Sequence, residues 1–242
     1  GKTFDAPPPT MEMLTSVDED FKYKVTYGFF TLGWITVDLV PDTVYKGQKC
    51  HYLKTVIKSN PSIPFMGVEE NHYHSFFISQ DSLPRSLIFW VDNIDEGFMK
   101  EAIYKYDREN GLVYSFYEGE PSDTLSLEEP ASSGHIIFYL SRFFAGLTTP
   151  YDIPVYIENE KGRLRASSSP RVEYRDYEAF EEPVPTYYSE GQGDVQGPFG
   201  FHGYYKSWFS ADKWRVPLEG NVKVWLGYVK VKLIEYSREA YE

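Results

Sequence analysis

The sequence contains one cysteine, and a single thiol excludes a disulfide within the chain. This residue, Cys50, begins the run Cys50–Ile57, whose apolar and β-branched residues are typical of a strand. The pattern favours a small buried apolar side chain at Cys50 over a metal ligand or a nucleophile.

Positive charge and long apolar runs are also scarce. The chain carries 24 Lys and Arg against 36 Asp and Glu, which gives a formal net charge of −12. Binding to a phosphate backbone or to anionic lipid needs clustered cations, so the composition predicts no nucleic-acid partner and disfavours anchorage on anionic lipid. No apolar run approaches the ~20 residues of a membrane helix, so we expect a protein that is not integral to a membrane.

The familiar motifs of catalysis are missing too. The chain has no Gly-x-Ser-x-Gly elbow, no P-loop and no His-Glu-x-x-His pair. Gly191–Asp194 has the glycines of a phosphate loop without a following helix, so a flexible loop is favoured there. Asp92–Glu96 has oxygen ligands at a spacing that fits no calcium loop, and a hairpin turn is favoured. The sequence therefore predicts no catalytic residue, no cofactor and no enzymatic activity.

Two histidines give the clearest indication of a metal site. In a strand, His72 and His74 point their imidazoles to the same face, within reach of one ion. Other candidate ligands lie nearby in sequence or could join them through the fold: Glu69, Glu70, His51, His135 and His202. No second pair with a definite spacing is present, so a half-exposed pair of strand histidines is favoured and no metal ligand is assigned.

Aromatic residues, by contrast, make up 18% of the chain and gather in short alternating runs. In Phe21–Tyr27 the apolar and aromatic residues occupy every second position, as in a strand with one wet face. Such runs recur about every ten residues between turn signals, which is typical of an antiparallel meander. We therefore expect an all-β fold, a strongly curved antiparallel sheet or open β-barrel with one packed α-helix. Residues 1–18, with three prolines, predict an extended arm, and residues 19–242 one β-rich domain.

One segment predicts the helix. Ser132 or Ser133 can cap a helix over Gly134–Ala145, which Gly146 ends. Its apolar stripe, which we expect to pack on the concave face of the sheet, consists of Ile136, Ile137, Leu140, Phe143 and Phe144. His135, Ser141 and Arg142 lie off that stripe. Shorter, more polar strands follow the helix, and Glu181–Pro198 has the prolines and glycines of a loop.

The aromatic stretch Phe199–Tyr236 is the segment around which we expect the chain to be organised. Turn residues at 210–213 and 219–221 divide it into strands, the last of them long. In that last strand the apolar positions change from even to odd at Gly227, which predicts a β-bulge. Residues 226–233 also repeat the pattern of residues 32–39. We expect two equivalent strands, each bent at its glycine, close together in one sheet.

The chain resembles a known bacterial family. The elements that carry the likeness are Phe21–Gly28, Leu32-Gly33, Phe138–Arg142, Trp208–Asp212, Arg215–Leu218 and Leu226-Gly227. Together they are similar to the exported family called domain of unknown function 3108, over roughly residues 20–236. The resemblance implies a secreted, periplasmic or envelope-associated β-rich protein of Gram-negative bacteria, and it implies no activity. We accordingly expect an exported protein whose signal peptide is absent from the sequence given.

The aromatic residues are also the remaining candidates for a binding site. In one interpretation they fill an ordinary β core. In another, a curved sheet and its helix enclose a pocket for a lipid or other apolar ligand, because small-molecule sites are concave and mostly apolar. The candidate ligand-binding residues are Trp34, Phe143, Tyr204, Trp208, Trp225 and Tyr228. A third interpretation is a glycan-binding module or an envelope assembly factor. Rings buried around a cavity would favour the lipid, and an exposed planar row would favour the sugar.

Overall fold

The computed structural model describes residues 6–64, 67, 69–95, 98–129, 132–133, 135–157, 160–196, 202–224 and 227–240. Strands dominate, and the described residues include two short helices, neither long and apolar enough to cross a membrane. The elements are α1 (Met11–Leu14), β1 (Val17–Tyr27), β2 (Phe30–Tyr45), β3 (Gln48–Ser59), β4 (Glu69–Gln80), β5 (Leu83–Asp95), β6 (Phe98–Asp107), β7 (Leu112–Tyr117), β8 (Glu120–Ser126), β9 (Ser132–Ser133), α2 (Ile137–Phe144), β10 (Tyr151–Ile157), β11 (Glu160–Arg175), β12 (Val184–Gln196), β13 (His202–Ser210), β14 (Pro217–Val224) and β15 (Gly227–Ala240).

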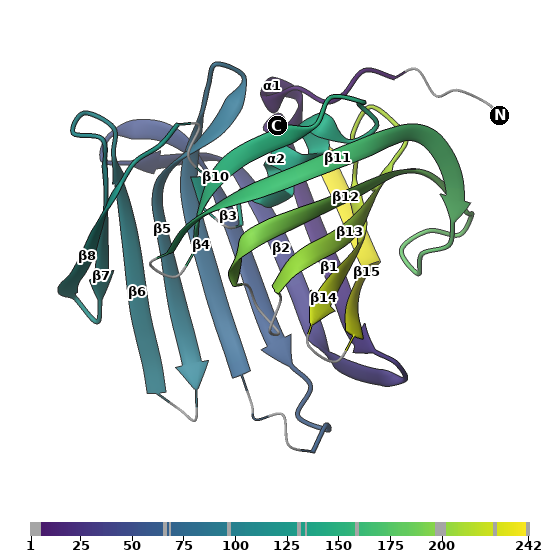
Figure 1. Cartoon of the computed structure of the whole chain (residues 1–242), viewed down its shortest axis with the longest axis horizontal. Coiled ribbons are helices and arrows are strands. Elements are labelled where there is room, and N and C mark those ends of the chain that lie inside the picture. Colours follow the sequence, from purple (N-terminus) through teal and green to yellow (C-terminus); the bar gives the residue numbers. More distant parts are fainter. Residues whose placement is uncertain are drawn as a thin grey trace.

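All fifteen strands belong to one sheet, built from two meanders. Its order is β8-β7-β6-β5-β4-β3-β2-β1-β15-β14-β13-β12-β11-β10-β9, so β1–β8 run outwards in one direction and β15–β10 in the other (Figure 1). The first and last strands therefore meet at the centre, where Phe21 lies opposite Tyr236. Neighbouring strands are antiparallel, except for the two-residue β9, which is parallel to β10. The expected all-β, antiparallel fold with one packed helix is confirmed.

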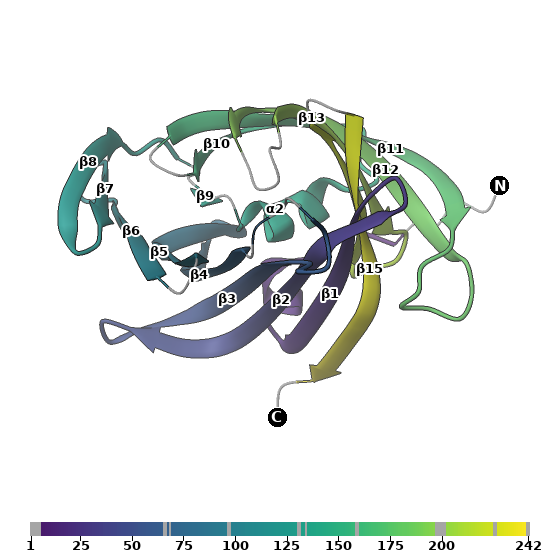
Figure 2. The ribbon, with the colours of Figure 1, turned by 90° about the horizontal axis from the view of Figure 1, so that it is seen from below.

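The sheet curls around α2 without closing into a barrel (Figure 2). The far end of the second meander contacts the first meander through side chains: Ser133 of β9 lies against the inner face of β4 and β5, where its Oγ is 3.2 Å from Ser75 Oγ and 3.3 Å from Ser86 Oγ. Tyr156 of β10 likewise packs edge-on against Tyr106 of β6, with 6.0 Å between ring centroids. These contacts hold the curve in shape, although β8 and β9 share no ladder of backbone hydrogen bonds.

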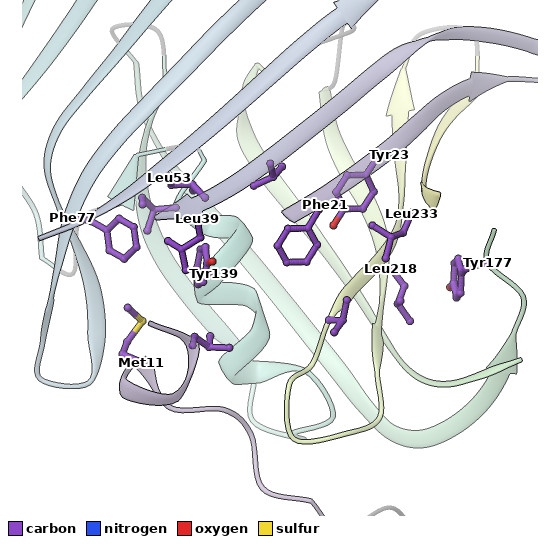
Figure 3. Packing of buried hydrophobic residues seen from close by; sticks show 14 residues of the cluster. Met11, Phe21, Tyr23, Leu39, Leu53, Phe77, Tyr139, Tyr177, Leu218 and Leu233 are labelled. Carbon is purple, nitrogen blue, oxygen red and sulfur yellow. The ribbon is translucent and has the colours of Figure 1, made fainter. Parts of the chain in front are cut away.

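The largest core cluster lies between the concave face and α2 (Figure 3). Alternation along β1 buries Phe21, Tyr23 and Val25, as the sequence predicts. Phe21 packs edge-on against Phe138 of the helix at 5.0 Å and lies 5.2 Å from the ring of Tyr236. The central strand pair and the helix thus share one apolar interior.

The helix differs from its prediction in length, cap and exposure. It begins at Ile137, the preceding Ile136 has no side-chain capping bond, and Ser132-Ser133 form β9 instead of the expected cap. The prediction of a single buried stripe is also wrong. Tyr139 and Arg142, which lie off the stripe, are fully buried, because the curled sheet surrounds the helix on several sides.

A buried ion pair fixes the helix to the central strand. Arg142 donates from Nη1 to Glu19 Oε1 at 2.8 Å and from Nη2 to Oε2 at 3.1 Å, and neither side chain is exposed. The guanidinium also donates to the carbonyl of Trp214, and the hydroxyl of Tyr236 donates to Glu19 Oε2 at 2.7 Å. Hydrogen bonds therefore offset the cost of burying both charges.

The repeated segments lie in one sheet, on either side of β1. Tyr23 has Ile35 of β2 as one neighbour and Leu233 of β15 as the other. The ladder between β1 and β2 shifts register beside Gly33, where an added Cβ would lie 2.2 Å from the carbonyl oxygen of Lys58. Only a glycine allows that approach of the two backbones.

The expected bulge at Gly227 is wrong, as is the turn at 219–221. Residues 219–221 lie within β14, which pairs with β15 up to Val224 opposite Gly227. The apolar positions change from even to odd because the chain reverses between these strands, and Val222 and Val229 then face each other. Reversal and bulge give the same change of phase in a sequence.

Two segments expected to be irregular are structured. The extended arm predicted over residues 1–18 is wrong for 11–18, because Met11 and Leu14 of α1 lie in the core and β1 begins at Val17. The loop predicted over Glu181–Pro198 is largely β12, paired with β11 and β13. Its Gly191 lies in that ladder, where a Cβ would be 2.6 Å from the carbonyl oxygen of Arg165, so close packing accounts for this glycine.

Candidate functional site

A cavity of about 360 Å³ lies between α2 and the concave face of the sheet. Strands from both meanders and one face of the helix form its wall, so its shape exists only in the assembled fold. We call it the inner cavity; it is lined by Tyr23, Ile35, Val37, Thr55, Ile57, His135, Ile137, Phe138, Ser141, Ser207, Phe209, Pro217, Glu219, Gly220, Val222 and Val231. Apolar side chains predominate in that set. Both the volume and the lining are typical of small-molecule sites.

Several polar groups of this wall already have partners in the protein. Tyr23 donates its hydroxyl to the carbonyl of Pro217 at 2.7 Å, and burial raises its pKa, so the phenol is uncharged. Ser141 donates to the helix carbonyl of Phe138. The carboxylate of Glu219 accepts bonds from the side chains of Arg175 (2.8 Å) and Tyr177 (3.2 Å). The hydrogen bonds of these groups are therefore made within the protein.

The imidazole of His135 borders the inner cavity without such a partner among the described residues. It stacks on the ring of Tyr73 with 4.2 Å between centroids, and it lies 5.7 Å from the ring of Phe89. Burial among these rings lowers the pKa of His135 to about 4, so the side chain is neutral at physiological pH. A neutral imidazole can both donate and accept a hydrogen bond.

This environment predicts a pH dependence of stability. The unfolded chain binds a proton at His135 near pH 6.5 and the folded chain only near pH 4, so stability falls as the pH falls between these values. We expect His135 to contribute on the order of 1–3 kcal/mol of that loss. Urea denaturation at a series of pH values should show a shallower acid slope for His135→Phe. An unchanged slope would contradict the buried neutral state. Burial lowers the pKa of His51 and His74 too, so part of the slope should remain.

Most of the aromatic residues nominated from the sequence lie elsewhere. Trp225 lies outside the described residues. None of the other five lines the inner cavity: Trp34, Phe143, Tyr204, Trp208 and Tyr228. Tyr204 instead borders a separate hollow of about 410 Å³ and donates to Glu190, and Tyr228 is 40% exposed.

Strand alternation explains the placement of the two tryptophans. Ile35 of β2 and both Ser207 and Phe209 of β13 line the inner cavity, so their neighbours Trp34 and Trp208 point to the opposite face. There the indole of Trp208 donates to Glu173, and the guanidinium of Arg175 lies 4.2 Å from the centre of its ring. Size and aromaticity do not reveal which face of a strand is enclosed.

The helix contributes to the inner cavity with a face that includes only one residue of the predicted apolar stripe, Ile137. Ile137, Phe138 and Ser141 line it, whereas Leu140 packs with residues of β10 and β11 on the other side. Phe143 is half-buried between two core clusters. The sequence could have indicated this face through helical spacing, because positions 137, 138 and 141 lie on one side of a helix.

The strand histidines share a face as predicted, but each pairs with its own acid. His72 Nε2 lies 2.8 Å from Glu70 Oε1, and this bond lowers the pKa of Glu70. His74 Nε2 lies 3.2 Å from Asp92 Oδ2, and its Nδ1 is 2.7 Å from the hydroxyl of Tyr52. Within the described part of the chain, no group of three His, Cys, Asp or Glu side chains is placed to hold a metal. Cys50 is buried, which raises the pKa of its thiol.

A row of rings lies on the outer face of β3, β4 and β5, on the other side of the sheet from the inner cavity. The planes of Tyr52 and Trp90 are parallel, with 6.3 Å between centroids, and His74 stacks on Trp90 at 4.6 Å. Phe76 meets Trp90 edge-on at 5.1 Å. We call Tyr52, His74, Phe76 and Trp90 the outer aromatic row; apart from His74, its rings are half-buried.

Comparisons with known proteins address the fold. No family model matches the chain, and no curated protein matches it in sequence. Among solved structures, it is similar to the crystal structure of a beta-barrel-like protein of domain of unknown function DUF1849 from Brucella abortus. The TM-score is 0.59 at 10% identity, over 93% of this chain and 98% of that chain. At this identity the likeness concerns the fold alone, and the resemblance to domain of unknown function 3108 stays a prediction. By structure, the chain has a β-barrel-like fold whose sheet is not closed.

Proposed function

We propose that the protein is a non-enzymatic binding protein that takes an apolar ligand, such as a lipid or acyl chain, into the inner cavity. The observation that carries the proposal is a space of about 360 Å³ behind a mostly apolar wall. Ordinary packing leaves few voids larger than a water molecule. Hollows of about 410 and 510 Å³ occur elsewhere on the chain, so the inner cavity is distinguished by its apolar wall and its place between α2 and the sheet.

The polar chemistry of the wall supports binding over catalysis. Tyr23 and Glu219 are held by protein partners, and the remaining ionisable group in the described lining is one neutral imidazole, His135. A general acid or base acts next to a nucleophile or a second polar group that shares the proton. Among the described residues, no such arrangement surrounds the inner cavity.

Dye binding to variants of the helix tests the proposal. A naphthylamine dye that fluoresces in apolar surroundings should bind saturably to the parent protein. Ser141→Phe, which adds a ring on the face of α2 that lines the inner cavity, should lower that affinity roughly tenfold or more. The matched variant Ser79→Phe, on an exposed end of β4, should bind as the parent does. Absence of saturable binding to the parent, or equal binding by both variants, would contradict the proposal.

Glycan binding is the second candidate, favoured by the outer aromatic row. Parallel rings such as Tyr52 and Trp90 offer apolar faces on which a sugar ring can stack, and Asp92 and Glu70 supply hydrogen-bond acceptors nearby. If this face binds sugar, Trp90→Ala should lower retention on insoluble glucan or peptidoglycan at least tenfold, as for the loss of an aromatic anchor. Trp34→Ala, which changes an outward tryptophan elsewhere on the sheet, is the control. Equal retention of both variants would remove this candidate.

Export to the bacterial envelope belongs to the same proposal. It is supported by the resemblance of Phe21–Gly28, Phe138–Arg142 and Trp208–Asp212 to an exported family. A role in envelope assembly would need a partner in place of a small ligand. Fractionation of cells that express the full-length gene tests the location, since recovery in the cytoplasmic fraction would contradict export.

A further inference from the structure

We infer that the ligand of the inner cavity is a single-chain carboxylic acid, whose carboxyl group pairs with the imidazole of His135. This inference rests on the proposed function and adds the chemistry of the ligand's head. Its starting point is the unequal polarity of the wall. Three of its polar side chains have no hydrogen-bond partner among the described residues: His135 and Thr55, which adjoin Tyr73 at one corner, and Ser207, which belongs to β13 in the other meander.

That corner is formed by His135 and Thr55. The imidazole stacks on Tyr73 at 4.2 Å, and Thr55 lies directly opposite Tyr73 in the ladder between β3 and β4. The β-carbons of such a cross-strand pair lie about 5 Å apart, so Thr55 and His135 both adjoin Tyr73. The rest of the wall nearby is apolar, with Ile57 and Ile137 among its residues. A ligand with one polar end and one chain fits this division.

The lack of cations in the described part of the wall indicates which polar head group the ligand carries. Among the residues that the structure describes, no Lys or Arg lines the inner cavity, so a phosphate or sulfate head would be buried there without a counter-charge from them. The carboxylate that the described part of the wall contains, that of Glu219, is paired with Arg175, and the phenol of Tyr23 is bonded to Pro217. A carboxyl group can be buried there without a cation, because the acid and the imidazole can share one additional proton. Whether that proton lies on the acid or on the ring, the pair carries no net charge.

The proton that the pair needs comes from water. A fatty acid is ionised in solution at neutral pH, and burial keeps the empty site's His135 uncharged by lowering its pKa to about 4. Binding therefore takes up about one proton for each acid bound, and affinity for the acid should rise as the pH falls from 8 towards 6. The titratable groups that share the wall are Tyr23 and Glu219, and Tyr73 packs against the ring itself.

Ligands that differ only at the head test the inference. Dodecanoic acid should displace the naphthylamine dye from the parent at neutral pH about ten- to a hundredfold more tightly than methyl dodecanoate, which has no acidic proton. In His135→Phe that preference should disappear, when the affinities of the acid and the ester are each compared with that variant's own affinity for the dye. His135→Gln, which keeps a donor and an acceptor, should recover part of it. His72→Phe, on the outer face, should behave as the parent does.

The outcomes separate this inference from the function on which it rests. If the parent binds the dye but shows no preference for the acid, or if His135→Phe keeps the preference, the inference fails and the apolar site stands. If the parent binds neither dye nor acid, the proposed function fails and the inference with it. Should His135→Phe not fold, the His135 ring protons report on the parent itself: in nuclear magnetic resonance spectra they should shift on addition of the acid and not of the ester.

Discussion

Replacing Arg142 by methionine is expected to lower the free energy of unfolding by about 3–5 kcal/mol. The variant leaves the carboxylate of Glu19 fully buried, with the hydroxyl of Tyr236 as its remaining partner among the described residues, and it removes both Arg142 donors from the carbonyl of Trp214. An uncompensated buried charge is among the few single changes that can remove a large share of a domain's stability. Urea denaturation followed by tryptophan fluorescence measures the loss.

A double variant separates charge from packing. Glu19→Leu combined with Arg142→Met removes both charges, so it should recover much of the stability that Arg142→Met alone loses. Arg171→Met, at an exposed position of β11, should change stability by less than about 0.5 kcal/mol. If the double variant is no more stable than Arg142→Met, the loss comes from packing or from Trp214 and not from the buried carboxylate.

The second large effect is expected at Phe21, in the centre of the core. Its side chain is 2% exposed and packs against Phe138 of the helix and Tyr236 of the last strand. Phe21→Ala should therefore cost about 3–5 kcal/mol, because it removes a ring from a site enclosed by both meanders and α2. The same denaturation measurement applies.

Phe143→Ala is the matched comparison, because it removes the same ring from a half-buried position of α2. The smaller burial predicts a loss of about 1–2 kcal/mol. Equal losses at Phe21 and Phe143 would show that Phe143 is as enclosed as the core, and the helix would then lie deeper in the sheet than its contacts indicate. A loss below 1 kcal/mol at Phe21 would contradict the position of the core itself.

The sequence predicted the fold class because strands and helices each produce a regular spacing of apolar residues between near neighbours in the chain. Alternation in Phe21–Tyr27 predicts a strand with one buried face, and turn residues at short intervals predict an antiparallel meander. The helix was predicted for the same reason, from the 3.6-residue spacing of Ile136, Leu140 and Phe143. Each of these patterns involves neighbours in the chain, so no tertiary information is needed to recognise it.

The wrong predictions from the sequence came from patterns that can have two physical causes. A change of apolar phase at Gly227 results from a bulge or from a hairpin, and the sequence does not distinguish them. Gly191 has the composition of a loop, yet it lies in a strand where a neighbouring backbone comes too close for a side chain. Arg142 lies off the apolar stripe and would be exposed on an ordinary surface helix. It is buried because Glu19, 123 residues earlier in the chain, supplies the opposite charge.

The site depended on tertiary structure to a greater degree than the fold did. By itself the sequence determined an all-β chain, rich in aromatic rings and poor in cations, with one helix and with no recognisable catalytic motif. Which rings face a cavity was decided by how far the sheet curls around α2, since that curvature sets which face of β2 and β13 is enclosed. His135 and Thr55 are 80 residues apart in number and come to line the same cavity only when the segment of β9 and α2 folds back over β4 and β5. Long-range contacts of this kind leave no local period in a sequence, and the polar corner of the inner cavity was therefore visible only in three dimensions.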